Sequence, residues 1–84
     1  MNSRHAKTVA AVFQQPTSAN IEWAAIEALL LAVGCSVIEG RGSRVRFAKE
    51  QLIETFHRPH PSKEAKRYQV RAARDYLIRL GVTP

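Results

Sequence analysis

The chain has 84 residues, of which 13 are Lys or Arg and seven are Asp or Glu, so its formal net charge is +6. This length suits one small domain with a thin core, because such a chain buries only about 60% of its unfolded surface. The single cysteine, Cys35, excludes an internal disulfide framework. No apolar stretch approaches the roughly 20 residues that span a bilayer, and no signal peptide is visible. We therefore expect a soluble, cytoplasmic protein without membrane contact.

The charge is unevenly distributed along the chain. Residues 41–79 contain eleven basic and four acidic side chains, whereas residues 1–40 contain two basic and three acidic ones. A basic half on a small domain is typical of proteins that bind a polyanion, first of all RNA or DNA. The alternative is surface charge that serves only solubility.

A first helix is predicted between its N-cap, Asn2 or Ser3, and Pro16, which ends it. Its apolar face is expected to consist of Ala6, Val9, Ala10 and Phe13.

A second helix is predicted after Asn20, which is a good N-cap, and Gly34 stands where a left-handed C-cap belongs. Its apolar stripe is wide, so we expect it to be the most buried element. Trp23, in its first turn, is expected to pack in the core. The remaining residues of the stripe are Ile21, Ala25, Ile26, Leu29, Leu30, Ala32 and Val33.

Three strands are predicted next, over residues 35–39, 44–47 and 52–57, with turns at residues 40–43 and 48–51. In the second strand, period-two alternation places Val45 and Phe47 on one face and Arg44 and Arg46 on the other. The apolar pair should pack against the helices. The alternation of the third strand is too imperfect to assign its faces.

A last helix is predicted to begin between Ser62 and Tyr68 and to end at Gly81. Its apolar face is expected to consist of Val70, Ala73, Tyr76, Leu77 and Leu80, and its basic remainder of Lys66, Arg67, Arg71, Arg74 and Arg79.

This order of elements predicts an α+β fold, in which a three-stranded antiparallel sheet has helices on one face and arginines on the other. We expect a single domain over residues 1–84, with an extra N-terminal helix in residues 1–15 added to a core of residues 20–82.

Four features, in this order and spacing, resemble the HicA toxin family. They are Gly34 after the core helix, Gly42-Ser43 at the strand turn, Pro59-His60-Pro61, and Leu80-Gly81-Val82. The resemblance covers residues 20–82. It implies an α-β-β-β-α fold like that of double-stranded-RNA-binding domains, the activity of a messenger-RNA-cleaving toxin, and inhibition by a HicB antitoxin.

One departure from the family concerns the residue after the Gly-Ser turn. In the family a histidine thought to be catalytic follows that turn within a residue or two, but here Ser43 is followed by Arg44 and Val45. Arginine stays protonated and cannot act as a base. It can bind phosphate and stabilise charge that develops during phosphodiester cleavage.

The candidate catalytic residues are therefore His57 and His60, because imidazole suits acid and base roles near neutral pH. The alternative is that both histidines only shape a strand exit that is bounded by prolines. Neither a metal nor a cofactor is expected, because two histidines fall short of the three or four ligands of a zinc site.

The candidate RNA-binding residues share a basic or hydroxyl side chain near the strand turn, the strand exit or the last helix. We expect contacts mainly to phosphate, on messenger RNA, and an antitoxin that masks the same cations. The alternatives are a non-catalytic RNA-binding module and a protein-interaction domain with an acidic partner. The candidates are Arg41, Ser43, Arg44, Arg46, Arg58, Lys66 and Arg67.

Overall fold

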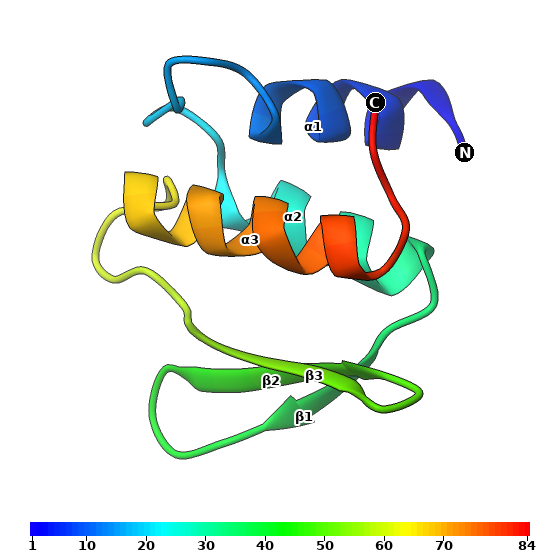
Figure 1. Ribbon diagram of the computed structural model, residues 1–84. Helices are drawn as coiled ribbons and strands as arrows, with labels where there is room; N and C mark the ends of the chain where they lie inside the picture. Colours follow the sequence, from blue (N-terminus) through cyan, green and yellow to red (C-terminus); the bar gives the residue numbers. More distant parts are fainter.

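The computed structural model describes residues 1–84 and confirms the α+β class with its additional N-terminal helix (Figure 1). The elements are α1 (Ser3–Val12), α2 (Trp23–Ala32), β1 (Ser36–Glu39), β2 (Arg44–Lys49), β3 (Leu52–His57) and α3 (Arg67–Arg79). None of the helices has both the length and the apolar character needed to cross a membrane.

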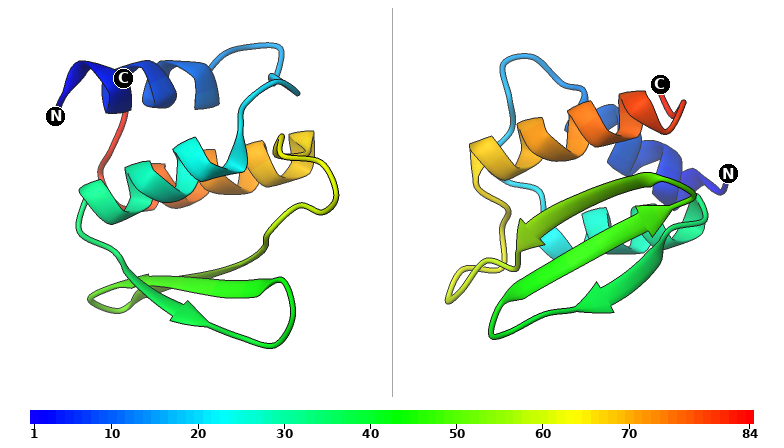
Figure 2. Two further views of the ribbon diagram at one scale, coloured as in Figure 1. Left: turned by 180° about the vertical axis from the view of Figure 1, so that it is seen from behind. Right: turned by 60° about the horizontal axis from the view of Figure 1, so that its bottom comes forward.

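The elements form three layers. The sheet is one layer, α2 and α3 lie side by side on one of its faces, and α1 lies across the two helices without reaching the sheet (Figure 1). The opposite face of the sheet, called the outer face below, has no helix over it, as the right-hand view of Figure 2 shows. The strand order is β1-β2-β3 and both pairings are antiparallel.

α1 begins as predicted, because the side chain of Asn2 accepts a hydrogen bond from the backbone N–H of His5 at 2.9 Å. The prediction that Ala6 and Ala10 face the core is wrong, since both are exposed. The buried residues are Thr8, Val9 and Val12. Val9 and Val12 therefore form the packing face of α1, and both belong to the hydrophobic core of the domain.

α2 begins at Trp23, later than predicted from the capping residue Asn20. The preceding stretch is extended and pairs with the segment before α3. The N–H of Ala65 donates to the carbonyl of Ile21 at 2.8 Å, and the N–H of Trp23 donates to the carbonyl of Lys63 at 2.9 Å. This non-local pairing overrides the local capping signal.

The sheet, α3 and α1 cover three sides of α2, and the fourth side faces solvent. Ala32 is therefore exposed, although it was predicted to face the core, and Leu31 is 46% exposed. Gly34 has the predicted left-handed conformation, with φ of 106°. The buried residues of α2 are Trp23, Ile26, Leu29 and Leu30.

β1 begins one residue after the predicted start, β2 extends two residues beyond its predicted end, and β3 has the predicted bounds. Val45 and Phe47 are fully buried against the helices, as predicted from the alternation. In β3 the buried Phe56 faces the same side. Trp23 packs on Phe56 with ring centroids 5.2 Å apart, so three aromatic rings join α2 to the sheet.

α3 presents the predicted apolar face, and Gly81, with φ of 81°, follows its end. The buried hydroxyl of Tyr76 lies 2.9 Å from the carbonyl oxygen of Leu52 and 3.1 Å from that of Phe47. Burial raises the pKa of Tyr76, and its hydrogen bond with the nearby Cys35 raises it further. The buried Cys35 thus serves as a core residue beside this anchor.

Candidate nucleic-acid interface

The register of the sheet brings Arg44 and His57 together. They are direct cross-strand partners, in the first pair of β2 and β3. The N–H of Arg58 donates to the carbonyl of Ser43 at 2.8 Å, so Ser43 and Arg58 are a hydrogen-bonded pair of the ladder. The neighbouring Arg44–His57 pair is consequently of the non-hydrogen-bonded type, in which Cβ atoms lie about 4.5–5.5 Å apart. The side chains of Arg44 and His57 therefore leave the sheet from adjacent positions on the outer face.

The remainder of the outer face adds a second arginine to this pair. Arg46 is flanked by Ile38 of β1 and Thr55 of β3. The outward-facing positions of the three strands hold no carboxylate, and the face becomes apolar toward its far end, at Ile53. We use the term cationic face for Arg44, Arg46 and His57 together with Arg41 of the preceding turn. Ser43 is exposed but lies opposite Arg58 and has the parity of the buried Val45, so it is not part of this face.

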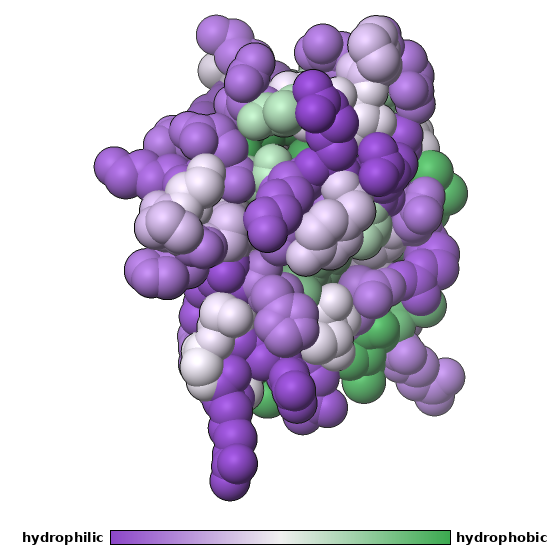
Figure 3. Space-filling model, turned by 90° about the vertical axis from the view of Figure 1, so that its left-hand side faces the viewer, coloured by the Kyte–Doolittle hydropathy of each residue, from purple (hydrophilic) through white to green (hydrophobic).

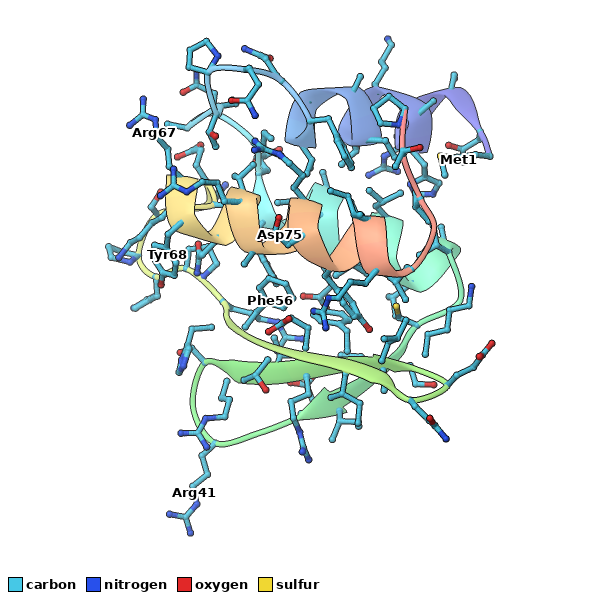
Figure 4. All side chains as sticks on the ribbon, viewed as in Figure 1. Met1, Arg41, Phe56, Arg67, Tyr68 and Asp75 are labelled. Carbon is cyan, nitrogen blue, oxygen red and sulfur yellow. The ribbon has the colours of Figure 1, made fainter.

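The turn before β2 places Arg41 and Arg44 next to each other. Gly42 has φ of 58°, and the N–H of Gly40 donates to the carbonyl of Arg44 at 2.9 Å. A Cβ atom on Gly40 would lie only 3.1 Å from that carbonyl oxygen, so glycine permits the close approach. Arg41 projects from the tip of the turn (Figure 4).

The arginines of the cationic face, and His57, are exposed and make no side-chain hydrogen bond or ion pair within the chain. The charge of these arginines is therefore available to a ligand. No group of three or more His, Cys, Asp or Glu side chains is arranged to hold a metal ion.

Arg58 is oriented differently from the arginines of the cationic face. Its guanidinium donates to Glu27 of α2 at 3.0 Å and to Glu39 of β1 at 2.7 Å, in two bidentate pairs. The Glu39 and Glu27 carboxylates raise the pKa of Arg58, and the hydrogen bond from Arg58 lowers the pKa of Glu39. Arg58 therefore joins the exit of β3 to α2 and β1, and its charge is compensated.

The ion pair of Glu39 predicts an acid-dependent contribution to stability. Its folded pKa lies below the ordinary value of 4.5, so the contribution is present above that value and is lost as the pH falls through the folded pKa. Glu39→Gln should lower the urea midpoint at pH 7, and its difference from the parent should be smaller at pH 3. Glu50→Gln, in an exposed turn, is the control. A difference that stays constant between the two pH values would contradict this assignment.

Gln69 holds the backbone at the end of β3. This buried side chain donates from Nε2 to the carbonyl of His57 at 2.6 Å and accepts from the N–H of Lys66 at 2.9 Å. It therefore caps α3 and fixes the residue that carries the imidazole. Sequence reasoning missed Gln69, although a glutamine three residues after a helix N-cap is a known capping signal. It also missed Glu27, the one charged residue within α2.

His60 lies outside the sheet, in the segment that connects β3 to α3, and is exposed. The structure therefore brings His57, but not His60, onto the outer face with Arg44. The side chain of His60 makes no hydrogen bond within the chain, and it follows His57 by three residues.

The basic residues in α3 and at its N-cap differ in their contacts, and the side chain of Arg71 has no hydrogen bond or ion pair. Arg74 donates to the carbonyl of Val12 at 3.1 Å, and Arg79 pairs with Glu54, so both hold elements of the fold together. Lys66 and Arg67 lie at the start of the helix, where Arg67 also donates to the carbonyl of Thr17 at 3.3 Å. The side of the molecule that carries the start of α3 and the turn before β2 is predominantly hydrophilic (Figure 3).

Comparison with known proteins gives one match. The family model of the HicA toxin of bacterial toxin–antitoxin systems matches residues 23–82, which span α2 to the end of α3 and leave out α1. Searches of curated proteins and of solved structures gave no match. The match covers well over half of the chain and includes the whole sheet, so the chain belongs to the HicA toxin family.

Proposed function

We propose that this toxin binds messenger RNA on its cationic face and cleaves it by acid–base chemistry without a metal, and that His57 takes the role of the missing family histidine. The observation that carries this proposal is the pairing of Arg44 with His57. Of the two residues after Ser43, Val45 is fully buried and only Arg44 reaches the outer face. The cross-strand partner of Arg44 is therefore the nearest backbone position from which a histidine can serve the same site.

The chemistry follows from the groups on this face. A neutral His57 imidazole would accept the proton of a ribose 2′-hydroxyl as that oxygen attacks the adjacent phosphorus. Arg44 and Arg46 would stabilise the negative charge of the phosphorane. The P–O5′ bond then breaks, and the leaving oxygen takes its proton from solvent or from His60, which lies beyond the end of β3 and off the outer face. The products are a 2′,3′-cyclic phosphate and a 5′-hydroxyl.

The antitoxin is proposed to cover the same cations. The chain belongs to a family of toxins that occur in toxin–antitoxin pairs, which supports the existence of a protein partner. Carboxylates of that partner could pair with Arg44 and Arg46, which have none within the chain. Such pairing would remove the phosphate-binding charge and thereby inhibit the toxin.

The test is incubation of the purified protein with labelled messenger RNA in EDTA, followed by analysis of the RNA ends. Fragments that end in 2′,3′-cyclic phosphate are expected. Intact RNA that shifts in a gel would instead indicate the non-catalytic RNA-binding module. RNA that is neither cut nor bound would favour the protein-interaction domain with an acidic partner.

The salt dependence of binding gives a separate prediction. Each phosphate contact with a single strand contributes about 0.7 to the slope of log K against log salt, so Arg44→Ala with Arg46→Ala should reduce the slope by about 1.4. Arg4→Ala with Lys7→Ala, on α1, removes the same charge from exposed positions away from the sheet. An equal effect of the two double variants would mean that only net charge matters.

A further inference from the structure

Tyr68 is an exposed aromatic side chain that the fold does not require. It is 57% exposed, and its hydroxyl makes no hydrogen bond within the chain. The other aromatic residues are buried or half-buried, and they are Phe13, Trp23, Phe47, Phe56 and Tyr76. Burial of apolar surface is what makes an aromatic ring stabilising, so Tyr68 contributes little to the core.

The position of Tyr68 relates it to the cationic face. It lies in the first turn of α3, and its neighbour Gln69 is bound to the carbonyl of His57 at 2.6 Å. This short contact fixes the helix turn that carries Tyr68 beside the end of β3. Figure 4 shows Tyr68 on the same side of the molecule as Arg41 and Arg67, between the two.

The charges around Tyr68 are those that a nucleic-acid backbone requires. Lys66 and Arg67 precede it, and Arg71 follows one helical turn later, exposed and without an ion pair. The hydrophilic side of the molecule in Figure 3 connects this group with the turn that carries Arg41. An aromatic ring among cations is the combination by which proteins bind unpaired bases and their phosphates together.

We propose that Tyr68 stacks on an unpaired base of the bound RNA, so that the substrate is single-stranded. The inference rests on the proposed function and specifies its substrate class. In a duplex each base is already stacked between its neighbours and presents no free ring face to a tyrosine. A single strand crossing from Arg44 to the start of α3 can turn one base onto Tyr68 while its phosphates contact the arginines.

The experiment uses single-stranded oligoribonucleotides with 2′-fluoro sugars, which lack the hydroxyl needed for cleavage, and with 2-aminopurine at successive positions. We expect the fluorescence to fall at one position on binding to the parent and to Tyr68→Phe, but not on binding to Tyr68→Ala. Because one base stack is lost, the affinity of Tyr68→Ala for the single strand should fall roughly 5- to 150-fold. Its affinity for a duplex of the same sequence should be unchanged.

Ile78→Ala is the matched control, because Ile78 is 50% exposed on the same helix, near its other end. Equal single-strand affinity and fluorescence for Tyr68→Ala and the parent would overturn the stacking proposal and leave Tyr68 as a protein-contact residue. Equal losses on single strand and duplex would also overturn it.

The Arg44→Ala, Arg46→Ala variant in the same assay separates this proposal from the function on which it rests. If that variant loses affinity while Tyr68→Ala does not, the stacking proposal fails and the RNA-binding function stands. If the parent binds neither single strand nor duplex, the proposed function itself fails.

Discussion

Replacement of His57 by alanine is expected to slow RNA cleavage by about 10²- to 10⁴-fold, the usual contribution of a general acid or base. The imidazole is exposed and its side chain has no partner within the chain, so the melting temperature should be unchanged. Cleavage rates at saturating RNA, with EDTA present, measure the effect. His5→Ala, on α1, is the control for loss of a histidine.

A positional exchange makes this test sharper. Because Arg44 and His57 are cross-strand partners, Arg44→His with His57→Arg exchanges the two groups and restores a histidine directly after the Gly-Ser turn. We expect the exchanged protein to regain much of the cleavage that His57→Ala loses. If both His57→Ala and a His57→Ala, His60→Ala variant cleave at the parental rate, histidine catalysis on this face is excluded.

Replacement of Phe47 by alanine is expected to lower the free energy of unfolding by about 3–5 kcal/mol. Phe47 is fully buried and forms an edge-on contact with Phe56, with centroids 5.9 Å apart. A domain of this size has a total stability of roughly 4–13 kcal/mol, so the loss is a large share of it and the variant should melt well below the parent. Urea denaturation measured by circular dichroism gives the value.

Two further variants serve as controls for Phe47→Ala. Phe47→Leu keeps most of the volume and should cost much less, whereas Phe13→Ala, at a half-buried position, should have an intermediate effect or less. A loss below about 1 kcal/mol for Phe47→Ala would mean that the aromatic contacts between sheet and helices are weaker than their burial implies.

The features predicted correctly from the sequence were those set by local chemistry. Gly34 and Gly81 adopt the left-handed conformations expected at helix ends, and the alternation of β2 correctly separated Val45 from Arg44. The start of α2 was not predictable in this way, because it depends on hydrogen bonds to residues 63–65, about forty positions further along the chain.

The site was predictable only in part, and the reason lies in one turn. A turn over residues 48–51 would have paired Arg44 with Thr55. β2 instead continues to Lys49, which pairs with Leu52, so the turn is two residues shorter and the partner of Arg44 is His57. The two ion pairs of Arg58 were equally hidden, since a sequence does not show which distant carboxylates meet a guanidinium.

Both ends of the chain lie beside α1, while the sheet lies on the far side of α2 and α3 (Figure 1). A tag, dye or surface tether joined to either terminus would therefore sit away from the outer face. The protein can be immobilised by its termini with Arg44 and His57 directed into solution. Single-molecule and surface-based measurements of RNA or antitoxin capture would then report on an unobstructed site.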